Sequence, residues 1–161
     1  MSIDVSDYDS VYEKLRTFGA SVPNGLIILP NNLSTANSID ELHQPVESDT
    51  VKTLLRINDI TYFDVLDGIA QPPYLQQYGN EWFGPTLFIT ASYLTQNPAV
   101  LSITLGLITN YLYDLFKNSN DVTASLEVIY EKADGTSKKI HYKGSHKGLP
   151  KIAEIIKELE K

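Results

Sequence analysis

The residues with the clearest chemical potential form the turn KGSHKG, residues 143–148, near the C-terminus. Its small residues leave backbone N–H groups accessible, and Lys147 adds a positive charge just before an expected helix. Backbone N–H groups at such a position can bind phosphate or carboxylate groups. Ser145, His146 and Lys147 are therefore a candidate anion-binding set. The alternative, which the spacing favours, is that the two glycines only let a strand turn into a helix.

The chain lacks the residue patterns of the common catalytic and metal sites. It contains no cysteine, which excludes disulfides, thiol catalysis and cysteine-based zinc sites. It also has no phosphate-binding loop, no paired-histidine zinc helix and no nucleophile elbow. His141 and His146 fall on an expected strand and on the loop after it, so they do not share a side. We therefore expect surface histidines, and neither a metal site nor a cofactor.

Aromatic side chains gather in the irregular stretch DGIAQPPYLQQYGNEWFG, residues 67–84. Tyrosine and tryptophan supply much of the binding energy at protein interfaces, and long irregular loops are often functional. The sequence therefore predicts that Tyr74, Tyr78 and Trp82 contact a protein partner. The alternative is that Trp82 and Phe83 fill the core beneath the loop while the two tyrosines are only half-exposed.

A hairpin expected over residues 122–143 contributes three more candidates. A three-residue turn at 133–135, with Gly135 in the left-handed conformation, pairs Val128 with Ile140 and gathers the apolar residues on one face. The opposite face then carries Lys139, His141 and Lys143. Such a face suits an acidic partner surface, and the alternative is a solvated outer face.

Size and charge limit the classes of protein. The 161 residues, 42% hydrophobic and 20% charged, suffice for one globular domain over residues 1–161 with a substantial core. A net charge of -7 argues against binding to nucleic acid or anionic lipid. Residues 1–116 hold 4 Lys/Arg and 13 Asp/Glu, a net of -9, whereas residues 117–161 hold 9 and 7, a net of +2. No signal-peptide pattern begins the chain, so we expect a cytoplasmic protein.

The element around which the others are expected to pack is an apolar helix over residues 98–117. Asn97 is a favourable N-cap residue, and Pro98 suits the first helical position. Apolar residues cover most sides of this helix, which predicts burial. Gly106 costs about 1 kcal/mol relative to alanine inside a helix, so we expect another backbone segment to pack closely against it. Only 15 uncharged residues, 99–113, run together in the helix. That is fewer than the roughly 20 that a membrane span needs.

The remaining elements predict an α/β fold in a single domain. The expected elements are a helix over 7–18, strands at 26–29, 60–66 and 86–91, a helix over 49–57, the hairpin at 122–132 and 136–143, and a last helix from Pro150. Strand, helix and strand over 26–66 form a right-handed crossover. The result is a mixed sheet of about five strands with a C-terminal antiparallel hairpin and with helices packed on it.

No pattern identifies a reaction, so the sequence favours a non-enzymatic protein–protein interaction or regulatory module of a cytoplasmic system. This expectation rests on the aromatic loop, the uneven charge and the absence of a catalytic set. The alternative is a small hydrolase or ligand-binding enzyme with its site at loop 67–84 and turn 144–148. Another protein is the expected partner. Nucleic acid and a membrane span are not expected, and a homo-oligomer is compatible with the sequence.

Overall fold

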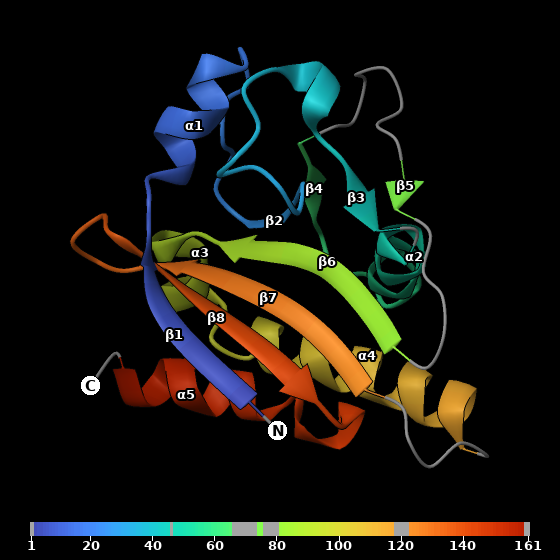
Figure 1. The fold of residues 1–161 in the computed structure, drawn as a ribbon. Helices are drawn as coiled ribbons and strands as arrows, with labels where there is room; N and C mark the ends of the chain where they lie inside the picture. The colour runs from blue at the N-terminus through green and yellow to red at the C-terminus, as the bar shows by residue number, and fades with distance from the viewer. Residues whose placement is uncertain (1, 46, 66–73, 76–80, 118–122, 160–161) are drawn as a thin grey trace.

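A computed structural model describes residues 2–45, 47–65, 74–75, 81–117 and 123–159 (Figure 1). The strands are β1 (Ser2–Tyr8), β2 (Leu26–Leu29), β3 (Gln44–Pro45), β4 (Phe63–Asp64), β5 (Tyr74–Leu75), β6 (Glu81–Ile89), β7 (Thr123–Glu131) and β8 (Ser137–Gly144). The α-helices are α1 (Val11–Thr17), α2 (Ser48–Ile57), α3 (Ala91–Gln96), α4 (Val100–Phe116) and α5 (Lys151–Leu159), and the short 3₁₀ helices are η1 (Ile39–Glu41) and η2 (His146–Gly148).

Within these described ranges, six strands form one mixed sheet in the order β1-β8-β7-β6-β2-β4, and β3 and β5 form a separate pair. The predicted α/β class is confirmed, with six strands in the main sheet rather than about five. The expected crossover is also present, because β2 and β4 are parallel and α2 lies between them in sequence. β6 runs antiparallel to β2 and parallel to β7, and it begins at Glu81 instead of residue 86.

The additional strand is β1, where the sequence predicted the beginning of a helix over residues 7–18. The helix starts only at Val11, and the Ser10 side chain caps it by accepting a hydrogen bond from the Glu13 N–H at 3.3 Å. Before it, Ile3 and Val5 alternate with polar residues, which is the two-residue period of a strand. β1 pairs with β8 along its whole length, so β8 lies inside the sheet.

The register of the C-terminal hairpin is as predicted. Val128 lies opposite Ile140, and Leu126 lies opposite Tyr142. Gly135 has a φ of 89°, the left-handed conformation that the three-residue turn requires. Leu126, Val128, Ile140 and Tyr142 therefore share one face of the sheet, and Ile129 lies on the other.

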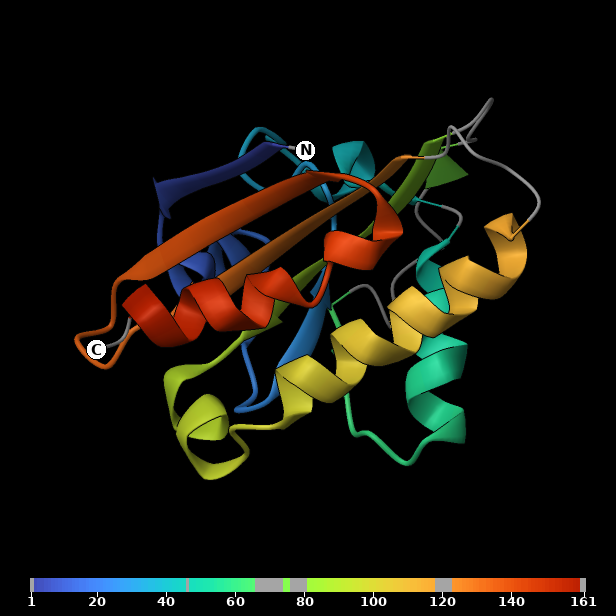
Figure 2. The same ribbon diagram turned by 90° about the horizontal axis from the view of Figure 1, so that it is seen from below.

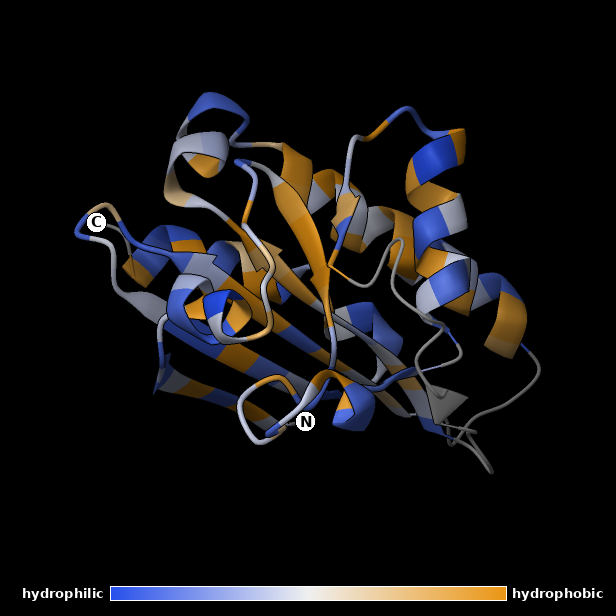
Figure 3. Ribbon diagram, turned by 90° about the horizontal axis from the view of Figure 1, so that it is seen from above, coloured by the Kyte–Doolittle hydropathy of each residue, from blue (hydrophilic) through white to orange (hydrophobic). Residues whose placement is uncertain are grey.

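Helices cover the two faces of the sheet unequally. α2, α4 and α5 pack on the face that carries the larger apolar cluster, which includes Ile28, Leu87, Val128, Leu105 and Ile152 (Figure 2). α1 and the segment 33–42 cover part of the other face, around Ile27, Leu29, Phe88 and Ile129. The middle strands are accordingly predominantly hydrophobic, while the helices show both hydrophobic and hydrophilic residues (Figure 3).

α4 is the predicted central helix, but it is buried on one side only. Its buried residues are Leu101, Thr104, Leu105, Ile108 and Leu112. On the opposite side Ile103 is 51% exposed and Tyr113 is 56% exposed. A Cβ atom at Gly106 would have no neighbouring atom within 4 Å among the described residues. The expectation that another backbone segment packs against Gly106 is therefore wrong for this fold.

No helix in the described part of the chain has both the length and the apolar character to cross a membrane.

Candidate functional site

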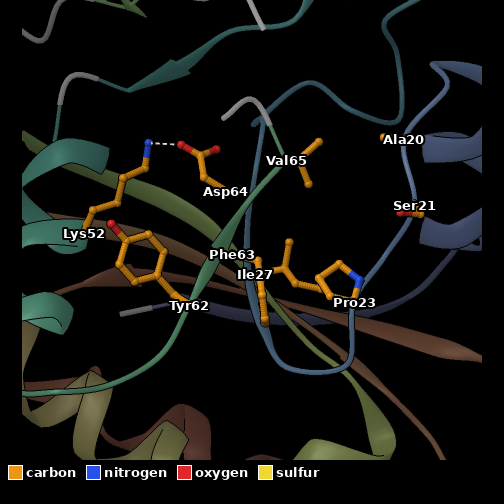
Figure 4. A pocket seen from close by; sticks show the side chains of 9 residues that line it. All are labelled: Ala20, Ser21, Pro23, Ile27, Lys52, Tyr62, Phe63, Asp64 and Val65. Carbon is orange, nitrogen blue, oxygen red and sulfur yellow. Dashed lines mark hydrogen bonds and ion pairs between the residues drawn. The ribbon is translucent and has the colours of Figure 1, made fainter. Parts of the chain in front are cut away.

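A cavity of about 480 Å³ lies at the edge of the main sheet, beside β4 (Figure 4). Four parts of the chain line it: the segment 20–23, β2, α2 and residues 62–65. Its volume falls in the range of pockets that hold small molecules. The cavity is therefore large enough for a small ligand.

The cavity has one polar wall and one apolar wall. Figure 4 shows Lys52, Tyr62 and Asp64 on one side of β4, and Pro23 and Val65 on the other. Successive strand residues point to opposite faces, so Asp64 points toward α2 while its neighbours Phe63 and Val65 point away from it. A molecule in the cavity would contact charged groups at one end and hydrocarbon at the other.

The polar wall is built around an ion pair between α2 and β4. The Lys52 ammonium donates a hydrogen bond to the Asp64 carboxylate and lies 3.7 Å from the Asp49 carboxylate. The Lys52 and Asp64 side chains are only 10% and 16% exposed, whereas the Asp49 side chain is 64% exposed. Breaking a buried pair leaves an uncompensated charge, but replacing both partners by apolar residues is often neutral. Stability alone therefore does not require charged groups at this wall.

The apolar wall is held in place by contacts around Gly25. A Cβ atom at Gly25 would lie 2.8 Å from the Phe63 ring, so the ring packs directly on this backbone. The Thr90 hydroxyl accepts a hydrogen bond from the Gly25 N–H at 3.0 Å and donates to the Asn24 side-chain oxygen at 2.6 Å. These contacts tie the segment before β2 to the sheet, and this segment contributes Pro23 to the cavity.

Sequence reasoning missed this cavity, although one residue carries a signal for it. Lys52 falls on the side of α2 whose other members, Ser48, Val51 and Leu55, are all buried. A lysine on the buried side of an amphipathic helix is almost always paired. Its partner Asp64 lies on the expected strand over 60–66 and carries no comparable signal in the sequence. The two residues come together only through the crossover that places β4 beside α2.

The predicted aromatic site is only partly described by the structure. Tyr74 lies in β5 opposite Gln44, whereas Tyr78 lies outside the described residues. Trp82 is 2% exposed and belongs to the larger core cluster. A Cβ atom at Gly84 would lie 2.6 Å from its ring. Trp82 therefore fills the core, as the alternative interpretation held, but Phe83, which that interpretation also placed in the core, is 36% exposed.

The three candidates on β8 share one sheet face, as the register predicted: Lys139, His141 and Lys143. Each contacts a residue of the same chain. The Lys139 ammonium lies 6.0 Å from the centre of the Tyr8 ring. His141 Nε2 is 2.9 Å from the Ser125 hydroxyl, and the Lys143 ammonium is 3.7 Å from the Glu81 carboxylate. These residues remain predicted contacts for a partner.

The structure brings Ser145, His146 and Lys147 together in η2. The Ser145 hydroxyl accepts a hydrogen bond from the Lys147 N–H at 3.3 Å, and the Ser145 carbonyl accepts one from the Gly148 N–H at 3.0 Å. These two N–H groups thus have partners within the turn. The predicted anion binding stays a prediction, and it would have to use other donors.

His146 packs against α4. Its ring lies edge-on to Tyr113, with the ring centres 6.3 Å apart. Neither ring nitrogen has a hydrogen-bond partner among the described residues. Burial lowers the pKa of His146 below its ordinary value, and the charge of Lys147 lowers that pKa further. The imidazole is therefore held in its neutral form beside the Tyr113 ring.

A second surface of interest is the α4 outer face, which we define as Ser102, Ile103, Gly106, Asn110 and Tyr113. No charged residue occurs in α4 between Val100 and Tyr113. The neighbouring α5 shows the usual pattern, because its exposed residues include Lys151, Glu154, Lys157 and Glu158. The α4 outer face thus carries no charge before the exposed Asp114, which follows Tyr113, and the normally charged α5 lies beside α4 (Figure 2).

Comparisons with known proteins provide no assignment: the chain matches no protein-family model, no curated protein and no solved structure. In the described ranges, no three histidine, aspartate or glutamate side chains group as a metal site would.

Proposed function

We propose that this protein is a non-enzymatic, cytoplasmic module that binds another protein, and that the α4 outer face is its contact surface. The observation that carries the proposal is the exposure of Ile103 and Tyr113, 51% and 56%, on a helix side that carries no charge before Asp114. Exposed apolar patches that are rimmed by polar residues mark interaction sites. Burying the exposed half of Ile103 alone would contribute about 1 kcal/mol to binding.

Tyr113 is suited to act as an aromatic anchor in the interface. Tyrosine is enriched among the residues that dominate binding energy, because it combines a large apolar ring with a polar hydroxyl. The edge-on contact with His146 restricts the ring before any partner binds. A side chain that is already ordered loses less conformational entropy on binding.

Gly106 lies between these two residues and determines the kind of partner that fits. Nothing described lies within 4 Å of its missing side chain, so a partner backbone can approach α4 closely there. Ile103 and Tyr113 are ten residues apart, which is about 15 Å along a helix axis. A partner helix of about three turns can contact both residues at once.

The negative charge of the protein favours a partner with basic residues on either side of its apolar stripe. The net charge is -7, and residues 1–116, which include α4, carry a net of -9. A partner helix with an apolar stripe and flanking lysine or arginine side chains would complement this charge, whereas a second copy of the chain would be repelled. The occupant that we propose is therefore a basic amphipathic helix of another protein.

The experiment begins with photo-crosslinking in the native host, with p-benzoylphenylalanine in place of Tyr113. The same group in place of Ile57, which is 72% exposed on α2, is the matched control. The crosslinked protein is then purified, and its affinity for the full chain is measured by calorimetry. Ile103→Asp and Gly106→Leu should each weaken binding by about tenfold or more, because they place a charge or a bulky side chain at the interface centre. Ile57→Asp should leave the affinity unchanged.

Two results would contradict the proposal. One is an affinity that neither Ile103→Asp nor Gly106→Leu changes. The other is self-association in sedimentation experiments that Ile103→Asp abolishes, because the α4 outer face would then bind a second copy of the chain.

A further inference from the structure

We propose that the cavity beside β4 binds a small zwitterion, specifically a free α-amino acid with an apolar side chain. This site involves no residue of the α4 outer face, so it is independent of the proposed protein-binding function. Three features of the cavity support the proposal: the buried ion pair, the apolar residues on the other side of β4, and the volume that both sides line.

The ion pair disfavours ligands that carry a single charge. A carboxylate alone would compete with Asp64 for the Lys52 ammonium, and the Asp64 side chain is only 16% exposed. An ammonium alone would likewise draw Asp64 away from Lys52, which is 10% exposed. In the first case the nearly buried Asp64 carboxylate would share its counter-charge, and in the second Lys52 would be left with the exposed Asp49 carboxylate 3.7 Å away, and both arrangements are unfavourable.

A zwitterion avoids this cost because it brings both charges together. Its carboxylate can accept hydrogen bonds from the Lys52 ammonium while its ammonium donates to the Asp64 carboxylate. Each protein charge then keeps an opposite charge beside it, and charge-assisted hydrogen bonds of this kind are stronger than neutral ones. An α-amino acid carries the two charged groups on the same carbon atom, as a compact ion pair on the protein requires.

The opposite wall determines the side chain of the ligand. Pro23, Ile27 and Val65 line this side with hydrocarbon, and the Phe63 ring is 39% exposed beside them. None of these residues can match a charged or strongly polar group. With about 480 Å³ available, the space suits an amino acid such as leucine or valine and does not favour a large cofactor.

The experiment measures the binding of L-leucine to the full chain by calorimetry and by thermal melting. Three analogues test the recognition: leucinamide lacks the carboxylate, N-acetyl-leucine lacks the ammonium, and glycine lacks the apolar side chain. We expect leucine to bind and to raise the melting temperature as its concentration increases. Each analogue should bind about tenfold more weakly or worse, because it leaves one wall unmatched.

Variants locate the binding in the cavity. Asp64→Asn should abolish leucine binding, and Asp7→Asn is the matched control because Asp7 also pairs with a lysine, Lys138 at 2.6 Å, but on β1. Asp64→Asn removes a partner of the nearly buried Lys52 and can therefore destabilise the fold. Val65→Trp provides a second test that leaves both charges of the ion pair in place. The indole would occupy the half-exposed apolar side of the cavity, so leucine binding should be lost while the chain remains folded.

The proposal is overturned if neither leucine nor valine binds to the wild-type protein. It is also overturned if N-acetyl-leucine or leucinamide binds as tightly as leucine, since the site would then recognise one charge only. Leucine binding that survives in Val65→Trp would place the amino acid elsewhere on the molecule.

Discussion

Replacing Gly106 by alanine should stabilise the folded protein, which is the reverse of what a closely packed helix would show. Glycine inside a helix costs about 0.5–1 kcal/mol relative to alanine, because it loses more backbone freedom on folding. The added methyl group would meet no atom within 4 Å among the described residues, so no steric penalty opposes this gain. We expect the free energy of unfolding to rise by about 1 kcal/mol. For a chain of this size, the melting temperature should rise by about 2–4 °C.

The assay is urea unfolding followed by the fluorescence of Trp82, whose ring is buried in the core. Gly148→Ala is the matched control. A Cβ atom at Gly148 would lie 2.1 Å from the Tyr142 hydroxyl oxygen, so this variant should lose about 1–3 kcal/mol through overpacking. The two glycine-to-alanine changes should therefore shift stability in opposite directions.

A loss of stability in Gly106→Ala would refute this reasoning. It would mean that part of the same chain lies against Gly106, and the proposed contact surface would then be covered. A gain of stability together with weaker binding of the partner would show that Gly106 favours partner binding but lowers the stability of the fold.

Two other substitutions test parts of the structure described above. Burial lowers the pKa of His146 below 6.5, so the unfolded chain takes up a proton there that the folded chain resists. The free energy of unfolding should therefore fall as the pH drops through about 6.5, and this loss should level off below the folded-state pKa. His146→Phe should lack this pH-dependent loss of stability when both proteins are unfolded with urea between about pH 7.5 and 5. Gly84→Ala should lower the melting temperature, because its Cβ atom would lie 2.6 Å from the Trp82 ring and 2.7 Å from Leu126, and overpacking of this kind costs about 1–3 kcal/mol. An unchanged melting temperature would show that Trp82 can move aside.

The register of the C-terminal hairpin can be predicted from the sequence because the pattern of apolar residues in the two strands favours one pairing. Pairing Val128 with Ile140 puts Leu126, Val128, Ile140 and Tyr142 on the same face, and a shift by one residue would move the apolar set of one strand to the other face. The crossover between β2 and β4 was predicted for a similar reason. Continuous apolar residues such as those of β2 require cover on both faces of the sheet.

The N-terminal strand was mistaken for a helix because two periods overlap there. Tyr8 ends β1, yet it falls at helical spacing from Val11 and Tyr12, which belong to α1. The strand itself offers only Ile3 and Val5 as alternating apolar residues. Such a short pattern is outweighed by a helical stripe that continues into it.

The candidate sites illustrate a different limit of sequence reasoning. Lys52 and Asp64 are 12 residues apart, and only the three-dimensional crossover makes them one wall of a cavity. For α4, apolar residues on nearly every side predicted a helix but could not indicate which side is covered. That information depends on how α2, α5 and the sheet are placed.

The pairing of β1 with β8 has a consequence for how the chain is made. Ser2 pairs with Lys143 and Tyr8 with Ser137, so these partners are separated by 141 and 129 residues in the sequence. β1 is synthesised well before β8 and must therefore wait for its partner strand. Contacts between such distant residues slow folding and prolong the exposure of strand edges. The carboxylates of Asp4 and Asp7 place negative charges on β1, and charged edge strands resist pairing with strands of other chains.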